Sequence, residues 1–312
     1  MKHNIKITII LILMFFITQL IGLFITHAYS SGISLPYGME PPPEMKETTS
    51  TSIVSILFAF AIAISLFFLL IKIKAETFIR IWFFVVTILA IALTINVIGY
   101  KLNIIYSAFI ALILAIPLAY MKIFRRDILI HNLTELLIYP GIAAVFVPII
   151  NITGIIILLL IISIYDIWAV WHSEFMQKMA TFQINNLRFF TGFFIPYAGK
   201  KEKERIKLIK QKYKNKSEKF MTNKFKQAKI KINLAILGGG DIIFPIITSG
   251  IFYKTYNAFI PAFIITISAT IAILTLFVLA RKGKFYPAMP FLTIGMYIGM
   301  IINGLLMTFG II

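Results

Sequence analysis

The sequence predicts an all-α, polytopic membrane protein with nine transmembrane helices, six in an N-terminal part and three in a C-terminal part. Three observations support this prediction. Hydrophobic residues make up 60% of the 312 residues. They are grouped in apolar runs of about 20 residues, the length that one membrane-spanning helix needs. Lys and Arg gather on one side of the predicted membrane, as they do in cytoplasmic loops.

The composition excludes several classes of protein. Soluble domains contain about 45–50% apolar residues, whereas this chain has 60%, a mean hydropathy of +0.93 and only 13% charged residues. A soluble globular protein is therefore not expected, and a disordered chain would need low hydrophobicity and high charge. The chain has no cysteine, which excludes disulfides, thiolate catalysis, iron–sulfur clusters and cysteine-based zinc sites.

Nine apolar runs, separated by charged or turn-rich stretches, give the predicted spans. They lie near residues 7–27, 53–73, 81–99, 103–121, 134–151, 154–172, 232–253, 259–280 and 287–311. The first run ends near Ala28-Tyr29-Ser30, which resembles a signal-peptide cleavage site. Its apolar stretch of about 20 residues is longer than a signal core, so an uncleaved first span is expected, with cleavage as the alternative.

The basic residues predict the orientation. If the N-terminus is cytoplasmic, 27 of the thirty Lys and Arg residues fall on the cytoplasmic side, and only Lys46, Lys101 and Lys254 fall outside. Lys and Arg collect in cytoplasmic loops. We therefore expect a multi-pass protein of the cell membrane, with the N-terminus and the 173–231 loop inside and the C-terminus outside.

The long loop after the sixth run divides the chain into three predicted parts. Residues 1–198 hold six spans, residues 199–231 form a basic cytoplasmic loop, and residues 232–312 hold three spans. Residues 175–194 are expected to extend the sixth helix or to lie in the membrane interface. The Lys-rich run after them suits anionic lipid headgroups. Aromatic residues that could stack on bases are sparse there, so no nucleic-acid partner is expected.

Two carboxylates fall inside apolar runs. Ten of the twelve acidic residues, Glu135 among them, lie in loops or near span ends, whereas Asp166 and Asp241 lie at membrane depth. A charged Asp at the bilayer centre costs about 2.5–3.5 kcal/mol, so such a residue usually faces a protein interior or a cavity and has a partner. The sequence places no clear Lys or Arg within a span. The remaining partner for each Asp is the other Asp.

The predicted depths of these two carboxylates agree. With a helical rise of about 1.5 Å per residue, Asp241 lies about 15 Å past Lys231 and Asp166 about 12 Å before Glu174. Two carboxyls that meet at this depth cannot both ionise, so they would share a proton and titrate as a unit. One would take a proton from water while the other donates to a peptide carbonyl, as in aspartic proteases.

Short motifs surround the two carboxylates. Asp241 ends the run Gly238-Gly239-Gly240-Asp241, in which glycines would let an extended substrate approach or let helices pack tightly. Asp166 follows Tyr165, which is either part of a site or an ordinary core aromatic. The ninth run begins Pro287-Ala288-Met289-Pro290, where proline also suits a first helical turn.

Together these residues resemble the GxGD-type intramembrane aspartyl proteases of the presenilin and signal peptide peptidase family. That family carries Tyr-Asp in the sixth span, Gly-x-Gly-Asp in the seventh and Pro-Ala-Leu at the ninth. Here the matches are Tyr165-Asp166, Gly238-Gly239-Gly240-Asp241 and Pro287-Ala288-Met289. Nine spans and a long loop after the sixth also agree, so the resemblance covers nearly the whole chain. Met289 replaces the usual Leu, a change that conserves volume.

The resemblance implies an intramembrane aspartic endopeptidase, a minimal prokaryotic homologue with Asp166 and Asp241 as its catalytic pair. It implies that the substrate-binding residues are Tyr165, Gly238, Gly240, Pro287, Ala288 and Met289. No metal and no cofactor are expected. Presenilins have the same predicted orientation, so the substrates would be single-span membrane proteins or peptides with their N-termini outside.

Other classes stay open as alternatives. An ion-coupled transporter or channel also uses intramembrane Asp residues and broken helices, but no repeat or second interrupted segment matches one. Prepilin-type aspartyl peptidases carry a similar Gly-x-Gly-Asp motif, and nine spans disfavour them. An inactive homologue is disfavoured because both Asp residues are present. A zinc protease needs His-Glu-x-x-His, whereas the four His residues are scattered, and a pairing of Ser249 with His172 has little support.

Overall fold

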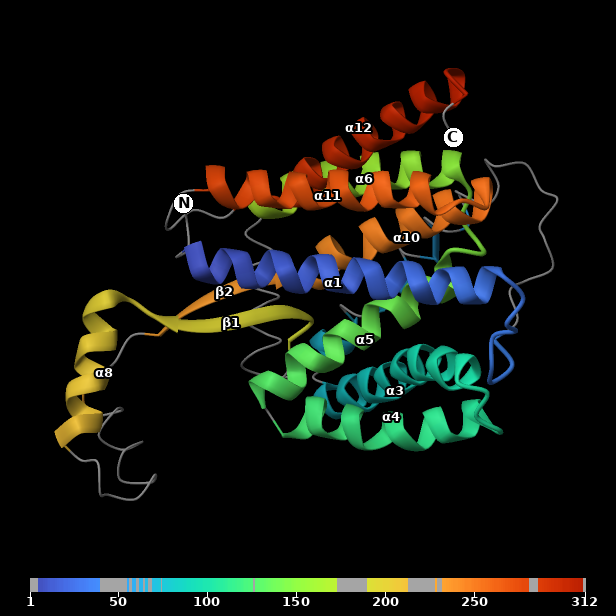
Figure 1. The fold of residues 1–312 in the computed structure, drawn as a ribbon. Helices are drawn as coiled ribbons and strands as arrows, with labels where there is room; N and C mark the ends of the chain where they lie inside the picture. Colours follow the sequence, from blue (N-terminus) through green and yellow to red (C-terminus); the bar gives the residue numbers. More distant parts are fainter. Residues whose placement is uncertain are drawn as a thin grey trace.

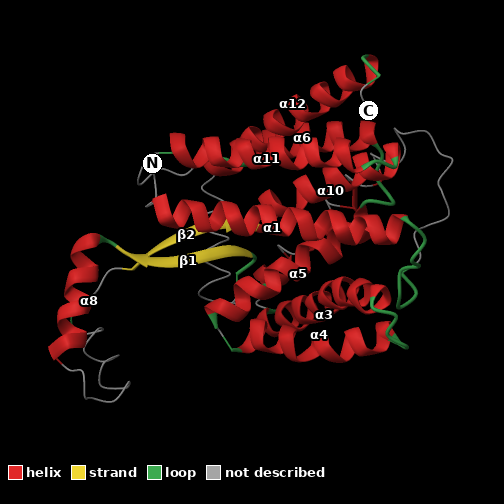
Figure 2. Ribbon diagram, viewed as in Figure 1, coloured by secondary structure: helices red, strands yellow, loops and turns green. Residues whose placement is uncertain are grey.

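The computed structural model of the chain is a bundle of long helices with one two-stranded sheet at its edge, as Figure 1 shows in chain order and Figure 2 by secondary structure. The predicted all-α class therefore holds for the bundle, and the sheet is the exception. The structure describes residues 5–39, 55, 58–59, 62–63, 65–66, 69–73, 75–125, 127–172, 190–212, 228, 232–280 and 286–310.

Helices make up most of the described chain. They are α1 (Ile5–Ser30), α3 (Glu76–Lys101), α4 (Ser107–Phe124), α5 (Ile128–Phe146), α6 (Ile152–Trp171), α8 (Lys200–Lys212), α10 (Gly239–Tyr256), α11 (Phe259–Leu279) and α12 (Met289–Thr308). Seven helices in these ranges are long and apolar enough to cross a membrane, namely α1, α3, α4, α5, α6, α11 and α12. Helix α10 is not among them, and the predicted span 53–73 lies largely outside the described residues. The number nine therefore stays a prediction.

The predicted seventh span, 232–253, is wrong in its first part. Residues Ile232–Gly238 form strand β2, and helix α10 begins only at Gly239. Within β2 the buried Ala235 and Leu237 alternate with more exposed neighbours, the period of two that a strand shows. An unbroken apolar run hides this period, because hydrophobicity alone does not separate a short buried strand from a helix.

Strand β2 pairs with a segment that lies far from it in the sequence. Its partner is β1 (Gly192–Ala198), and the two strands run antiparallel with Gly192 opposite Gly238 and Ala198 opposite Ile232. Of the two expectations for residues 175–194, an extension of the sixth helix is wrong at its end, where β1 begins, and a position in the membrane interface stays a prediction. Residues 173–189 lie outside the described residues. The sheet ties the segment after α6 directly to the start of α10.

Helix α5 begins earlier than the predicted span 134–151. The Asp127 carboxylate accepts the backbone N–H groups of Leu129 at 2.8 Å and Ile130 at 3.1 Å. These two donors have no partner within the helix, so an Asp at this position caps it. The helix therefore starts at Ile128, and Glu135 lies two turns inside it rather than at a span end.

The bundle has three parts in Figure 1. Helices α1, α5 and α10 lie in the middle, with α3 and α4 on one side and α6, α11 and α12 on the other. The main core lies among α1, α6, α10, α11 and α12 and includes Phe15, Ile246 and Leu292. Helices α3, α4 and α5 meet through small residues such as Ala90 and Ala115, which let membrane helices approach closely.

Helix α8 lies apart from the bundle beside the sheet in Figure 1. It spans Lys200–Lys212, so this part of the predicted 199–231 loop is helical. Arg205 donates to the backbone carbonyl of Ala228 at 2.8 Å and forms an exposed ion pair with Glu202. The helix is rich in Lys, as the sequence of this segment shows.

Candidate active site

Asp166 lies on α6 with its side chain turned toward α12. The residue is only 7% exposed. The backbone N–H of Met289 donates to its Oδ2 at 3.0 Å, and the backbone of Ala288 also bonds this carboxyl. Ala288 and Met289 are the cap and first residue of α12, so the unpaired N–H groups of that helix end meet the carboxyl. A negative charge is favourable at a helix N-terminus.

Polar contacts continue along α6 and α12 beyond Asp166. The hydroxyls of Ser163 and Thr293 lie 2.7 Å apart, and the Tyr297 hydroxyl donates to the Ile156 carbonyl at 2.6 Å. Met289, Thr293 and Tyr297 are four residues apart, so they lie on one face of α12. This face fixes the position of α12 against Asp166.

Asp241 is the third residue of α10, directly after the sheet. Gly238 is the N-cap of this helix and has extended backbone angles, and its backbone N–H donates to the Asp241 carboxyl. An acidic side chain at the third position that bonds the N-cap N–H is one half of a capping box. Gly238 is close to this carboxyl, since a Cβ on it would lie 3.1 Å from Asp241 Oδ2.

The two carboxyls belong to helices that pack together. Helices α6 and α10 are in contact, and Asp166 lies on the first and Asp241 on the second. The predicted meeting of the two helices is therefore observed. The equal depth of the two carboxyls stays a prediction, and its helical rise from Lys231 to Asp241 is wrong, because residues 232–238 form an extended strand.

The three glycines before Asp241 have different surroundings. A Cβ on Gly239 would lie 2.8 Å from the Tyr139 hydroxyl of α5, so this position is closely packed. A Cβ on Gly240 would meet nothing nearer than the Phe244 ring at 4.0 Å. Gly240 is exposed beside Asp241. Tight helix packing thus accounts for Gly239, whereas it gives no reason for glycine at Gly240.

A comparison with known protein families settles the class of protein. The family described as "Signal-peptide peptidase, presenilin aspartyl protease" matches residues 12–310. This chain belongs to that family. It is therefore an aspartic endopeptidase, an intramembrane aspartyl protease and a multi-pass membrane protein that acts on membrane-protein substrates. The resemblance read from the three motifs is confirmed.

Two solved structures share the fold. Both are described as a presenilin family intramembrane aspartate protease, one in space group C222 and one in space group P2. The match to the first has a TM-score of 0.59 and 14% sequence identity, and it covers 96% of this chain and 99% of that chain. The match to the second has a TM-score of 0.58 and 16% sequence identity, and it covers 95% of this chain and 96% of that chain. No curated protein sequence matches the chain significantly.

The remaining predicted site residues differ in their position. Pro287 is buried, Ala288 is partly buried and Met289 is 4% exposed, all at the start of α12 beside Asp166. Tyr165 is 40% exposed, and its ring centroid lies 6.3 Å from that of Trp168, one turn along α6. Tyr165 therefore lies on a different side of α6 from the Asp166 carboxyl. Among the described residues, no group of His, Asp and Glu could hold a metal ion.

The sequence analysis did not predict one buried polar cluster. Lys122 of α4 and Glu135 of α5 form an ion pair in which the two residues are 5% and 1% exposed, so the expectation of no basic residue within a span is wrong. His131 is 4% exposed beside them. The available signal was Asp127, a helix-capping residue before an apolar run. A helix started there would have placed Glu135 inside the span.

Proposed function

We propose that the protein hydrolyses peptide bonds within transmembrane segments of membrane proteins by a two-aspartate general acid–base mechanism. Asp166 and Asp241 are the proposed catalytic residues. The observation that carries the proposal is the contact of α6 with α10, the two helices that bear these carboxyls. Two adjacent carboxyls in a site of low dielectric hold one proton between them.

In the proposed reaction the two carboxyls exchange roles. The ionised carboxylate takes a proton from water, and the oxygen of that water attacks the peptide carbonyl carbon. The protonated carboxyl donates its proton to the carbonyl oxygen, which yields a gem-diol. The gem-diol collapses as the C–N bond breaks and a proton passes to the leaving nitrogen. The two products are a new carboxyl end and a new amine end, and the aspartate pair again holds one proton.

The other predicted site residues would bind the substrate near this pair. Gly240 supports this role, because it is exposed beside Asp241 and leaves room for an approaching chain. The segment Pro287, Ala288 and Met289 supports it through its contact with Asp166. Tyr165 and Gly238 complete the proposed set. Tyr165 has the weaker support, because its side chain packs beside Trp168.

The proposed topology places the N-terminus and the 173–231 loop in the cytoplasm of a cell with the protein in its cell membrane. In Figure 1, α1 begins at the end of the bundle where the sheet and α8 lie, and α12 ends at the opposite end. This arrangement supports termini on opposite sides. The basic helix α8 supports a cytoplasmic loop in contact with anionic headgroups. The proposed substrates are single-span segments with their N-termini outside.

Proteolysis in reconstituted liposomes tests the proposed function. Single-span peptides inserted in both orientations are incubated with wild type, Asp166→Ala and Asp241→Ala, and the products are mapped by mass spectrometry. We expect cleavage within the span by wild type, background cleavage by both variants, and a preference for substrates with their N-termini outside. Equal cleavage by both variants and wild type would exclude this pair as catalytic.

A further inference from the structure

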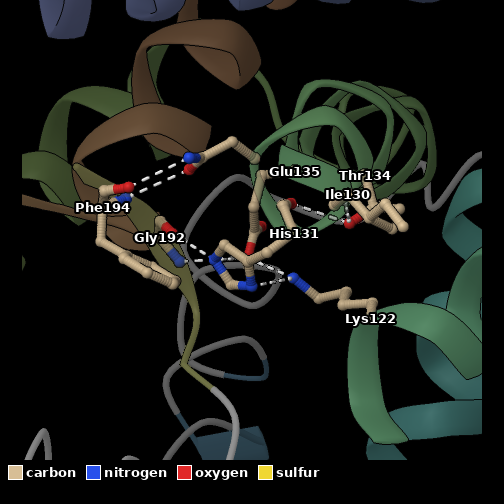
Figure 3. Close-up of polar contacts among 8 residues, drawn as sticks. Lys122, Ile130, His131, Thr134, Glu135, Gly192 and Phe194 are labelled. Atoms are coloured by element: carbon tan, nitrogen blue, oxygen red, sulfur yellow. Dashed lines mark hydrogen bonds and ion pairs between the residues drawn. The ribbon is translucent and has the colours of Figure 1, made fainter. Parts of the chain in front are cut away.

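The buried cluster of Lys122, His131 and Glu135 lies where the end of α4 and the start of α5 meet β1, outside the proposed catalytic pair. Figure 3 shows its members: Lys122 from α4, His131 and Glu135 from α5, and the backbone of Gly192 at the start of β1. Lys122, His131 and Glu135 are 5%, 4% and 1% exposed. Buried charges that no reaction step uses call for another role.

The three side chains surround both backbone polar groups of Gly192. Lys122 Nζ donates to Glu135 Oε1 and lies 3.5 Å from His131 Nδ1. A lysine ammonium only donates, so Nδ1 accepts and the His131 Nε2–H is left to donate. It does so to the Gly192 carbonyl at 2.8 Å, while the Gly192 N–H donates to Glu135 Oε1 at 3.2 Å.

Asn132 repeats this arrangement at Phe194. Its side-chain amide donates to the Phe194 carbonyl at 3.0 Å, and its carbonyl accepts the Phe194 N–H at 3.2 Å. Residues two apart in a strand present their backbone groups to the same edge. Side chains of α5 therefore take the place of a third strand along the first residues of β1 (Figure 3).

Stability alone does not explain the ion pair in this cluster. A buried ion pair must overcome the desolvation of both charges, and replacing such a pair by apolar residues of similar volume is often neutral or stabilising. What an apolar replacement cannot do is bond the backbone of Gly192. The position of that glycine is therefore the property that the cluster controls.

Gly192 is connected to Asp241 through a single residue, Gly238. It lies opposite Gly238 in the sheet, and Gly238 is the N-cap whose backbone bonds the Asp241 carboxyl. Gly192 has φ +134°, and a Cβ on it would collide with the Leu237 carbonyl oxygen and lie 3.2 Å from Gly238 Cα. With no space between the two glycines, a shift of Gly192 moves Gly238.

We infer that His131 and Glu135, with Lys122 as the counter-charge of Glu135, are positioning residues that hold the start of β1 and thereby fix Asp241 for peptide hydrolysis. The inference rests on the proposed function of Asp241. None of the three side chains touches the reacting atoms in this scheme. His131 and Glu135 act through Gly192 and Gly238, so loss of their bonds to Gly192 affects turnover rather than substrate binding.

Two matched double variants test the inference. Lys122→Met/Glu135→Gln and Lys122→Met/Glu135→Leu both remove the two charges, but only Gln keeps an oxygen that accepts the Gly192 N–H. We expect the Met/Gln enzyme to keep kcat near the wild-type value. We expect the Met/Leu enzyme to lose about 10–100-fold in kcat, the effect of a small misplacement of a catalytic group. KM and the melting temperature should be alike in the two variants.

Hydrogen exchange adds a readout that does not depend on activity. The Gly192 and Phe194 amides should exchange faster in the Met/Leu variant than in the Met/Gln variant. If the wild type cleaves no substrate, the proposed function fails, and this exchange comparison still tests the contact with β1. If the Met/Leu variant does not fold, His131→Gln against His131→Phe makes the same comparison at the Gly192 carbonyl.

Three results would overturn the inference. Wild-type kcat in the Met/Leu variant would show that the cluster does not act on the site. An equal loss of kcat in both double variants would assign the effect to the charges and not to the bond with Gly192. Unchanged exchange at residues 192 and 194 in the Met/Leu variant would show that the cluster does not hold the strand.

Discussion

The two carboxyls at the centre of this protein are held in different ways. Asp166 lies in the last third of α6 and accepts a backbone N–H from α12. A second contact between these helices joins the hydroxyls of Ser163 and Thr293. Asp241 lies in the first turn of α10, and its position follows from strand β2, the glycines before it and α5. One carboxyl thus depends on helix–helix contacts and the other on a strand and close glycine packing. Substitutions near Asp241 should therefore have the larger effects.

Of the substitutions around the two carboxyls, Gly192→Ala should have the largest effect. The alanine would have to adopt φ +134° and would collide with the Leu237 carbonyl, and such substitutions destabilise by more than about 1 kcal/mol. Proteolysis should fall at least about tenfold, because a displaced Gly238 misplaces Asp241. Activity per folded molecule and the melting temperature measure the two effects. Wild-type activity in this variant would show that the sheet does not position Asp241.

The pair Gly239→Ala and Gly240→Ala separates packing from substrate approach. A methyl group at Gly239 meets the Tyr139 hydroxyl, and overpacking of this kind costs about 1–3 kcal/mol. A methyl group at Gly240 has room, so the free energy of unfolding should stay the same or rise.

Denaturation and peptide cleavage are measured on both glycine variants. A rise in KM for Gly240→Ala at unchanged stability would assign Gly240 to substrate binding. Equal stability losses in the two variants would contradict the packing difference between the two glycines.

A smaller effect is expected on the Asp166 side from Thr293→Val. The substitution removes the hydroxyl that faces Ser163, and such hydrogen bonds in membrane proteins contribute about 0.6 kcal/mol on average. If the whole loss appears in the transition state, the rate falls about threefold. The control is Thr270→Val, which removes a hydroxyl that bonds the Thr266 carbonyl of its own helix. Equal rates for the two variants would mean that this contact does not position Asp166.

The smallest effect is expected from Met289→Leu, which restores the residue that the family usually has. Met289 reaches Asp166 through its backbone N–H, which both side chains leave in place. A volume-conserving swap in a core costs less than about 1.5 kcal/mol, so cleavage should stay within about twofold of the wild-type rate. A tenfold change in either direction would show that the side chain itself acts on the substrate.

The sequence predicted one half of the site better than the other. Asp166 and Asp241 stood out because a carboxylate inside an apolar run needs a specific reason. The strand before Asp241 could not be predicted, because residues 232–253 form one apolar run and the partner strand lies about forty residues earlier.

The Lys122–Glu135 pair was missed for a related reason. Each residue stood at the edge of an apolar run, where a charge needs no partner, and only the packing of α4 on α5 makes them neighbours. Contacts between elements far apart in sequence, unlike isolated polar residues, leave little local signal.

A double-mutant cycle on the two carboxyls tests the central claim most directly. Asp166→Asn, Asp241→Asn and the double variant are reconstituted at equal folded amounts, and cleavage of one single-span substrate is measured. Residues that act as one catalytic unit are not additive. We therefore predict that each single variant falls to the level of the double variant. A single variant that keeps a substantial fraction of the wild-type rate would contradict a mechanism in which the two aspartates share the reaction.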